Sequence, residues 1–397
     1  MRGFPPPPES RVRADMVYSD PAITRWFMQH VREVERTANV ASRRCPVTAL
    51  PLAPVDLDPV RVSDGLGSTW TVAEMLEHTS TDGIMVLHGG SVIYERLFGG
   101  LHIDTPHLCH SISKSIASCV AANLVERGLL DVDAALTAYA PELADSAYGD
   151  ATVRHLLDMS VGIRYTEDHE DDESEDARLD RLCGVKPSRA PDEPGSSYDF
   201  ATTTTKEGQH GTVLHYVSLN TDVLGWVMER ATGLSVPELI SRELWAKLGA
   251  EDDAYIALDG AGSAQLDGGL CCSLRDLARF GLMLARGGSI DGGRVVPDRW
   301  IEDVRAGGDT EAFAAAPDCG LLPRGWSYRS CFWVGERSDH IPFMALGMYG
   351  QMVYVHREAD VAVVKFSSQP RPADDMLVTR TFRSLESLAE VLAQSTV

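Results

Sequence analysis

Strand-like segments occur near both ends of this 397-residue chain, and helical segments fill the middle. Two β-type runs, 84–88 and 91–98, flank a Gly-Gly pair that suits the two-residue turn of a β-hairpin. Two further strand-like runs begin at Met352 and Val361. Because each strand needs a hydrogen-bonded neighbour, we expect one mainly antiparallel sheet built from both chain termini.

Helical periodicity dominates the region between these strands. From Ser111, apolar residues recur on one helix face as far as Gly128, which suits a C-cap. Similar patterns cover 221–233 and 273–288, and a final helix is expected over about 376–394. The predicted fold class is therefore α/β (α+β), a sheet with flanking helices and an inserted helical domain.

The domain boundaries follow from the same pattern. Residues 1–109 and 289–397 are expected to form the α/β domain, and residues 110–288 the mainly helical one. Residues 1–65 are rich in Pro and Arg and are expected to form an extended arm, apart from a helical stretch near 23–40.

Charge restricts the partners of this chain. Acidic residues outnumber basic ones by 58 to 36, and the net charge is −22. Such a protein repels phosphate backbones and anionic lipids, so nucleic acid and membranes are poor partners and a neutral or cationic small molecule fits better.

The first sixteen residues lack the apolar core of a secretory signal, and no apolar run reaches 18 residues. We therefore expect a cytoplasmic protein. A homodimer is one possible assembly, which the sequence does not decide.

The cysteines and histidines give no metal signature. Eight cysteines include no CxxC pair, and although His107 and His110 flank Cys109, the second half of a zinc pattern is missing. The sequence also lacks a P-loop, a dinucleotide fingerprint and a GxSxG elbow. We predict free thiols, no metal and no cofactor.

One acidic run stands out from the average composition. Residues 167–176 contain eight acids in ten positions. Like charges at this density resist packing, so a solvated loop is one interpretation. A negatively charged lip over an active site is the other, and the sequence leaves both open.

Ser111 and Lys114 stand three residues apart where a strand-rich region gives way to a helix. Positions i and i+3 share a helix face, so the hydroxyl and the amine can form a hydrogen bond. The helix N-terminus and partial burial disfavour the ammonium, so we expect a lowered pKa that lets Lys114 accept the serine proton. The alternative is an N-cap serine followed by an ordinary surface lysine.

Two later elements can contribute to the same cleft. Tyr216, Ser218 and Asn220 alternate immediately ahead of a helix, although such a segment alone is also typical of a capped helix. In the edge segment 347–351, glycines allow close backbone approach, and a free N–H there can serve an oxyanion.

In this order, the three elements resemble the serine β-lactamase and penicillin-binding family. The match is closest to its class C β-lactamase-like esterases and amidases. The strings HSISKS, HYVSLNTDVLGW, GLCCSLRDLARFG and MYGQMVYV are most similar to the 6-aminohexanoate-dimer hydrolases, which cleave nylon oligomers. The resemblance runs from about Thr71 to about Ser368 and implies a β-lactamase-like fold and a serine hydrolase that forms an acyl-enzyme without a cofactor.

The resemblance also implies roles for individual residues. Ser111 would be the nucleophile, Lys114 its base partner and Tyr216 the phenol that relays the proton. The backbone N–H groups of Ser111 and Met348 would bind the oxyanion, and Ser218 would support the tyrosine.

Five residues are implied on the substrate side. Asp180 would meet a substrate ammonium, and Asp267 replaces an asparagine that contacts substrate in those hydrolases. His169 replaces a tyrosine that closes over a bound amide. Asn220 and Tyr349 complete the set.

The departures from the family pattern bear on the substrate. Residues 345–347 read Ala-Leu-Gly where β-lactamases carry Lys-Thr-Gly, and the missing lysine counts against a β-lactam substrate. Because the lid residue is altered, we expect ready ester hydrolysis and weak amide hydrolysis of small neutral or amine-bearing molecules. A β-lactamase or D,D-peptidase, or a catalytically silent binding protein on the same fold, is the alternative.

Overall fold

The computed structural model describes most of the chain. The described ranges are 4–42, 46–168, 171–184, 186, 195–316, 322–323, 325–336 and 341–394. Within them, no helix combines the length and the apolar character that a membrane crossing requires.

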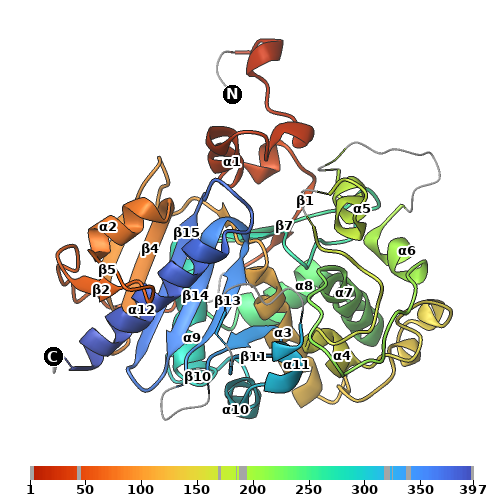
Figure 1. The fold of residues 1–397 in the computed structure, drawn as a ribbon. Coiled ribbons are helices and arrows are strands. Elements are labelled where there is room, and N and C mark those ends of the chain that lie inside the picture. The colour runs from red at the N-terminus through yellow and green to blue at the C-terminus, as the bar shows by residue number, and fades with distance from the viewer. Residues whose placement is uncertain are drawn as a thin grey trace.

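Seven strands form the main sheet, in the order β11-β12-β13-β14-β15-β4-β5, with every neighbouring pair antiparallel. β15 pairs with β4, with Val363 opposite Val86, so strands from both ends of the chain lie side by side (Figure 1). This confirms the predicted sheet. The strands are β4 (Thr81–His88), β5 (Ser91–Leu97), β11 (Ser327–Arg329), β12 (Phe332–Val334), β13 (Phe343–Gly347), β14 (Gln351–His356) and β15 (Val361–Ser367).

Helices cover both faces of this sheet. α9 (Leu274–Ala285) packs closely on one face, where a Cβ atom added at Gly281 would lie 3.6 Å from Val353. The adjacent Tyr354 points to the opposite face, since successive strand residues alternate. There it lies near acidic residues of α12 (Asp375–Gln394), which packs against β14 (Figure 1).

The predicted helices of the middle region are present. α3 (Ile112–Glu126) precedes Gly128, and α7 (Leu219–Thr232) ends at Gly233; both glycines adopt positive φ, as helix C-termini commonly require. The other α-helices are α1 (Pro21–Phe27), α2 (Val72–His78), α4 (Val153–Leu157), α5 (Glu175–Leu182), α6 (Ser197–Thr202), α8 (Val236–Ile240), α10 (Asp298–Ala306) and α11 (Thr310–Ala314). The exact domain boundaries stay a prediction.

A second sheet, which sequence patterns did not predict, has the order β1-β7-β8-β6. Its strands are β1 (Thr37–Val40), β7 (Ala254–Ala257), β8 (Leu270–Cys272) and β6 (His107–Leu108). The helical prediction for 23–40 is therefore wrong beyond Phe27. Pairing of β1 with β7, distant in sequence, decides the conformation of this short segment.

Short elements complete the architecture. The two-stranded ribbons are β2 (Arg61–Ser63) with β3 (Thr69–Thr71), and β9 (Ser289–Ile290) with β10 (Gly293–Arg294). The 3-10 helices are η1 (Pro8–Ser10), η2 (Ala14–Met16), η3 (Val31–Glu33), η4 (Leu136–Ala138), η5 (Pro141–Leu143) and η7 (Met348–Gly350), and η6 (Ser241–Trp245) is a π-helix.

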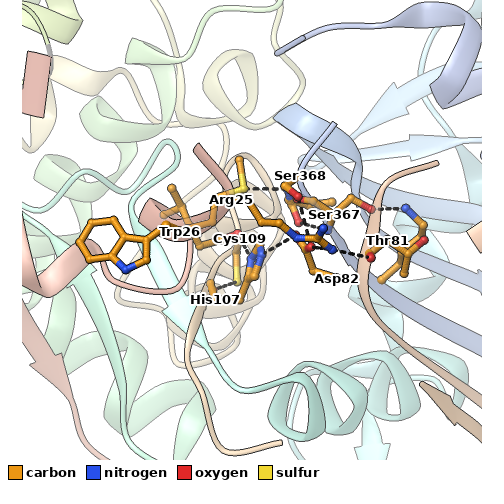
Figure 2. A network of polar contacts seen from close by, with 12 residues as sticks. Arg25, Trp26, Thr81, Asp82, His107, Cys109, Ser367 and Ser368 are labelled. Carbon is orange, nitrogen blue, oxygen red and sulfur yellow. Dashed lines mark hydrogen bonds and ion pairs between the residues drawn. The ribbon is translucent and has the colours of Figure 1, made fainter. Parts of the chain in front are cut away.

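A buried polar network connects the N-terminal segment, residues 4–42, to both sheets. The Asp82 carboxylate of β4 forms an ion pair with Arg25 of α1 and lies 3.3 Å from the His107 ring of β6 (Figure 2). It also accepts a hydrogen bond of 3.1 Å from the Ser368 hydroxyl. Burial raises the pKa of Asp82, but these partners outweigh burial and the net pKa is lowered. The carboxylate therefore remains charged and holds the segment that leads to Ser111.

The N-terminal segment also contributes to a small apolar cluster beside this network. The cluster joins residues of the N-terminal segment to the second sheet and to the turn after β13. Its buried members are Val17, Phe27, Met28, Val31, Leu108, Tyr255, Ala257, Cys271 and Tyr349. The predicted arm is thus an integral part of the fold near the C-terminal strands.

Candidate active site

Ser111 directly precedes α3, and its side chain makes no helix-capping hydrogen bond. Lys114, one helical turn later, has only 1% of its surface exposed. The interpretation of the pair as an N-cap serine with a surface lysine is therefore wrong. The Lys114 Nζ atom lies 2.9 Å from the Ser111 Oγ atom, as the i and i+3 spacing predicts.

Lys114 has a complete set of hydrogen-bond acceptors. Besides Ser111, its ammonium donates to the Ser218 hydroxyl at 3.1 Å and to the backbone carbonyl of Asp267 at 2.7 Å. An ammonium carries three donors, so all three are used. This geometry gathers residues from three distant parts of the chain around one cation.

The pKa of Lys114 differs in direction from the sequence-based expectation. Burial lowers the pKa of Lys114, but Tyr216, Asp267 and Glu167 outweigh it, and the net pKa is raised. The expectation of a lowered pKa is therefore wrong. The raised pKa favours the ammonium form of Lys114 in the resting site, which donates to Ser111 instead of accepting its proton.

Tyr216 lies beside this pair. Its ring centre is 5.1 Å from the Lys114 Nζ atom, and the ring stacks on Trp333 at 5.7 Å. Burial raises the pKa of Tyr216, whereas Lys114 and hydrogen bonding to Ser111 lower it, and the net pKa is raised. Tyr216 thus lies against Lys114, and the pKa of its phenol depends on both Lys114 and Ser111, which makes it a candidate for proton transfer.

Glu167 is a site residue that sequence patterns did not single out. Its carboxylate accepts hydrogen bonds from the Ser218 backbone N–H at 2.7 Å and from the Ser218 hydroxyl at 2.8 Å. Ser218 thus bridges the Lys114 ammonium and an acid. Within a run of eight acids, nothing in the sequence distinguishes the one that turns inward.

The remaining predicted residues fall into three groups. Asp180, Asp267 and Tyr349 line the pocket that contains Ser111. Asn220 does not line it, because its buried amide accepts a hydrogen bond of 3.0 Å from Tyr148 and donates to the sulfur of Met159. His169 lies outside the described residues.

The pocket around Ser111 has a volume of about 500 Å³ and is strongly acidic. Burial, followed by the nearby Asp180, raises the pKa of Glu35 to about 7. Burial likewise raises the pKa of Asp267. Such a lining favours neutral or cationic ligands over anions. The lining carboxylates are Asp15, Glu35, Glu167, Asp176, Asp180 and Asp267, alongside the cations Lys186 and Arg371.

The N-terminal segment forms one wall of this pocket, which sequence patterns did not predict. Ala14, Asp15, Tyr18, Ser19 and Glu35 all line it. The Tyr18 ring stacks on that of Tyr349, with centres 5.4 Å apart and planes within 10°. No motif marks these residues, so only the folded chain reveals their position.

The turn after β13 closes the pocket beside Ser111. A Cβ atom at Gly347 would lie 2.5 Å from the Cys109 carbonyl oxygen, so only glycine fits there without movement. This close approach brings Met348 to the pocket wall that also contains Ser111. Their backbone N–H groups are the candidates for an oxyanion hole.

Comparison with known proteins adds an independent line of evidence. A protein-family model described as Beta-lactamase matches residues 71–386. The 6-aminohexanoate-dimer hydrolase of Paenarthrobacter ureafaciens is 38% identical over 364 residues, which cover 91% of this chain and 88% of that protein. Esterase EstB of Burkholderia gladioli is 28% identical over 203 residues, which cover 44% of this chain and 47% of that protein.

Solved structures give a similar result. A Bacillus anthracis protein provisionally named a 6-aminohexanoate-dimer hydrolase has a TM-score of 0.87 and 27% identity. That comparison covers 99% of this chain and 100% of the other. A class C β-lactamase from Rhodobacter sphaeroides, at 17% identity and a TM-score of 0.53 over 80% of this chain and 97% of the other, shares the fold.

Proposed function

Because the chain belongs to the beta-lactamase family, we propose that it hydrolyses carboxylic esters and linear amides through an acyl-enzyme on Ser111. The observation that carries the proposal is the contact of 2.9 Å between a fully hydrogen-bonded Lys114 and the Oγ atom of Ser111, which lines an acidic pocket. A serine placed against a lysine in this way is one of the known arrangements for nucleophilic catalysis.

The proposed reaction begins when Ser111 Oγ attacks the substrate carbonyl carbon. The serine proton passes to the Tyr216 oxygen, while the N–H groups of Ser111 and Met348 stabilise the oxyanion. When the intermediate collapses, the leaving alcohol or amine takes that proton from Tyr216. Water then attacks the acyl group, loses its proton to Tyr216, and Ser111 recovers a proton as the acid departs.

Proton balance sets a pH requirement for this reaction. Tyr216 can accept the serine proton only after the Lys114–Tyr216 pair has lost one proton to solvent. Because the pKa of each group is raised, this loss becomes more complete as the pH rises above neutrality. The adjacent ammonium favours the phenolate form of Tyr216, which makes the tyrosine the effective base.

The pocket supports a neutral or amine-bearing substrate. Asp180 and Asp267 line it together with four further carboxylates, and these would attract an ammonium group. Residues 345–347 lack the lysine that meets the carboxylate of a β-lactam. Both features favour linear esters and amides over penicillins, in line with the names of the curated relatives.

Covalent labelling tests the proposed nucleophile. A fluorophosphonate is expected to add one label to the native protein, mapped to Ser111 by mass spectrometry, because an activated serine attacks phosphorus as it attacks a carbonyl carbon. Ser111→Ala should remain unlabelled. Ser115→Ala is the matched control, because that hydroxyl donates to Cys331 instead of facing the pocket. A folded native protein without a label, or a labelled Ser111→Ala variant, would rule out the acyl-enzyme.

Substrate comparison tests the preference for esters. Short p-nitrophenyl esters are expected to turn over faster than 6-aminohexanoate dimer, since the lid position that favours amides in the similar hydrolases holds His169 here. The p-nitroanilide of the same acyl group serves as a control for the acyl pocket. Equal rates for the dimer and the esters would contradict this preference.

A further inference from the structure

Gln351 begins β14 directly after the turn Met348–Gly350, and none of its surface is exposed. Its amide nitrogen donates to the Ser367 carbonyl at 2.7 Å and to the Met348 carbonyl at 3.0 Å. Its amide oxygen accepts the Ser367 backbone N–H at 2.9 Å. Gln351 does not line the pocket, so it does not meet substrate directly.

The two bonds to Ser367 determine how the Gln351 amide is oriented. The Ser367 N–H requires the amide oxygen, and the Ser367 carbonyl requires the amide nitrogen. The second N–H of the same nitrogen faces the Met348 carbonyl at 3.0 Å, with the weaker Met28 sulfur acceptor farther away at 4.0 Å. A side chain with this orientation holds a backbone carbonyl in one place.

The turn that Gln351 holds has an unusual backbone. Tyr349 has φ of +59°, a region that residues other than glycine rarely adopt, and Gly350 has φ of +89°. The Tyr349 N–H donates to the Pro372 carbonyl, and the Tyr349 carbonyl accepts the Gln369 N–H. These bonds leave the Met348 carbonyl to Gln351. Without Gln351, the peptide group that joins Met348 to Tyr349 keeps only the bond from its N–H to Pro372.

We infer that Gln351 is a positioning residue for the oxyanion hole: by holding the Met348 carbonyl, it keeps the Met348 N–H directed at the substrate carbonyl oxygen. The inference rests on the proposed function, because it assigns a role within the same reaction. The two N–H donors of the oxyanion hole, those of Ser111 and Met348, are then supported by one connected set of buried residues. Ser367 precedes Ser368, which bonds Asp82, and Asp82 contacts His107 upstream of Ser111 (Figure 2).

Kinetics of Gln351→Met test this role. We expect kcat for a p-nitrophenyl ester to fall about 10- to 100-fold with KM nearly unchanged, because a displaced oxyanion donor weakens only the transition state. The inhibition constant of phenylboronic acid, which becomes tetrahedral on Ser111, should rise by a similar factor. Fluorophosphonate titration counts the active sites. Partial unfolding would lower that count and leave the boronic acid affinity of the remaining sites unchanged.

Gln369→Met is the matched control. Gln369, which follows β15, is also buried and packs against Gly350 of this turn, but its side-chain amide has no hydrogen-bond partner within the described structure. Its replacement should leave kcat and boronic acid binding near the native values. Native kinetics in Gln351→Met, or equal losses in both variants, would overturn the inference.

Gln351→Glu gives a second readout. A glutamate keeps an acceptor for the Ser367 N–H, but when ionised it repels the Met348 and Ser367 carbonyls, and when protonated it can donate one hydrogen bond to them. Its activity, relative to the native protein, should therefore increase as the pH falls. A constant ratio across pH would contradict the assigned role.

These experiments distinguish failure of the proposed function from failure of the inference. If the native protein forms no Ser111 adduct, both the proposed function and the inference fail. If the adduct forms and Gln351→Met has native kinetics, only the inference fails.

Discussion

Replacing Lys114 by methionine is expected to lower kcat for ester hydrolysis by about 10³- to 10⁴-fold. The methionine fills a similar volume but removes the donors to Ser111, Ser218 and the Asp267 carbonyl. It also removes the positive charge that favours the phenolate of Tyr216. Stopped-flow measurement of acylation should show the loss in the first step, before the acyl-enzyme forms.

Lys365→Met is the matched control for this variant. Lys365 is the second fully buried lysine, and burial lowers its pKa to about 7. Its amine donates to the Thr79 carbonyl at 3.3 Å and to the Ser367 hydroxyl, and neither partner reacts with substrate. Its replacement should therefore lower stability while the folded, labelled fraction keeps a kcat far above that of Lys114→Met. Lys114→Arg keeps a charge but not the compact ammonium that meets three acceptors, so it should also be inactive. A folded Lys114→Met protein with native acylation would eliminate Lys114 from the mechanism.

Replacing Tyr216 by phenylalanine is expected to lower kcat by about 10²- to 10⁴-fold, the range typical of a lost acid–base group. The ring would still stack on Trp333, so the packing beside Lys114 should persist. In the native protein, kcat/KM should rise with pH above neutrality, because the Lys114–Tyr216 pair must first lose a proton. The variant should lose this rise, which a pH series of initial rates measures.

Tyr354→Phe is the control for the missing hydroxyl. The Tyr354 hydroxyl is buried on the main sheet without a hydrogen-bond partner in the described structure, so its removal should preserve activity. If Tyr216→Phe retained both the native rate and the native pH dependence, Tyr216 would not carry the proton. Another group near Ser111 would then have to accept it.

The main sheet was predictable because its central strands have strong local signals. The 84–98 hairpin has a glycine turn between β-type runs, and the C-terminal strands are continuous apolar runs. The second sheet was not predictable. Its strands contain two to four residues each, and their pairing joins Thr37–Val40 to a segment more than 200 positions away. Such pairing leaves no periodic pattern in the sequence.

The site shows a similar division. Ser111 and Lys114 are neighbours on one helix, so their spacing predicts their contact. The pKa of Lys114 was not predictable from spacing, because the acids that raise it, Glu167 and Asp267, arrive from other parts of the chain. The inward orientation of Glu167 and the wall formed by the N-terminal segment likewise depend on tertiary structure.

The N-terminal wall of the pocket separates substrate choice from reaction chemistry. Ala14–Ser19 and Glu35 shape the pocket, yet they lie outside the residues matched by the family model, 71–386. Ser111, Lys114 and Tyr216 lie inside that match. Substitutions at these lining positions are therefore expected to alter the range of accepted compounds without changing the reacting groups. For laboratory evolution, these positions are a compact target that leaves the reaction centre intact.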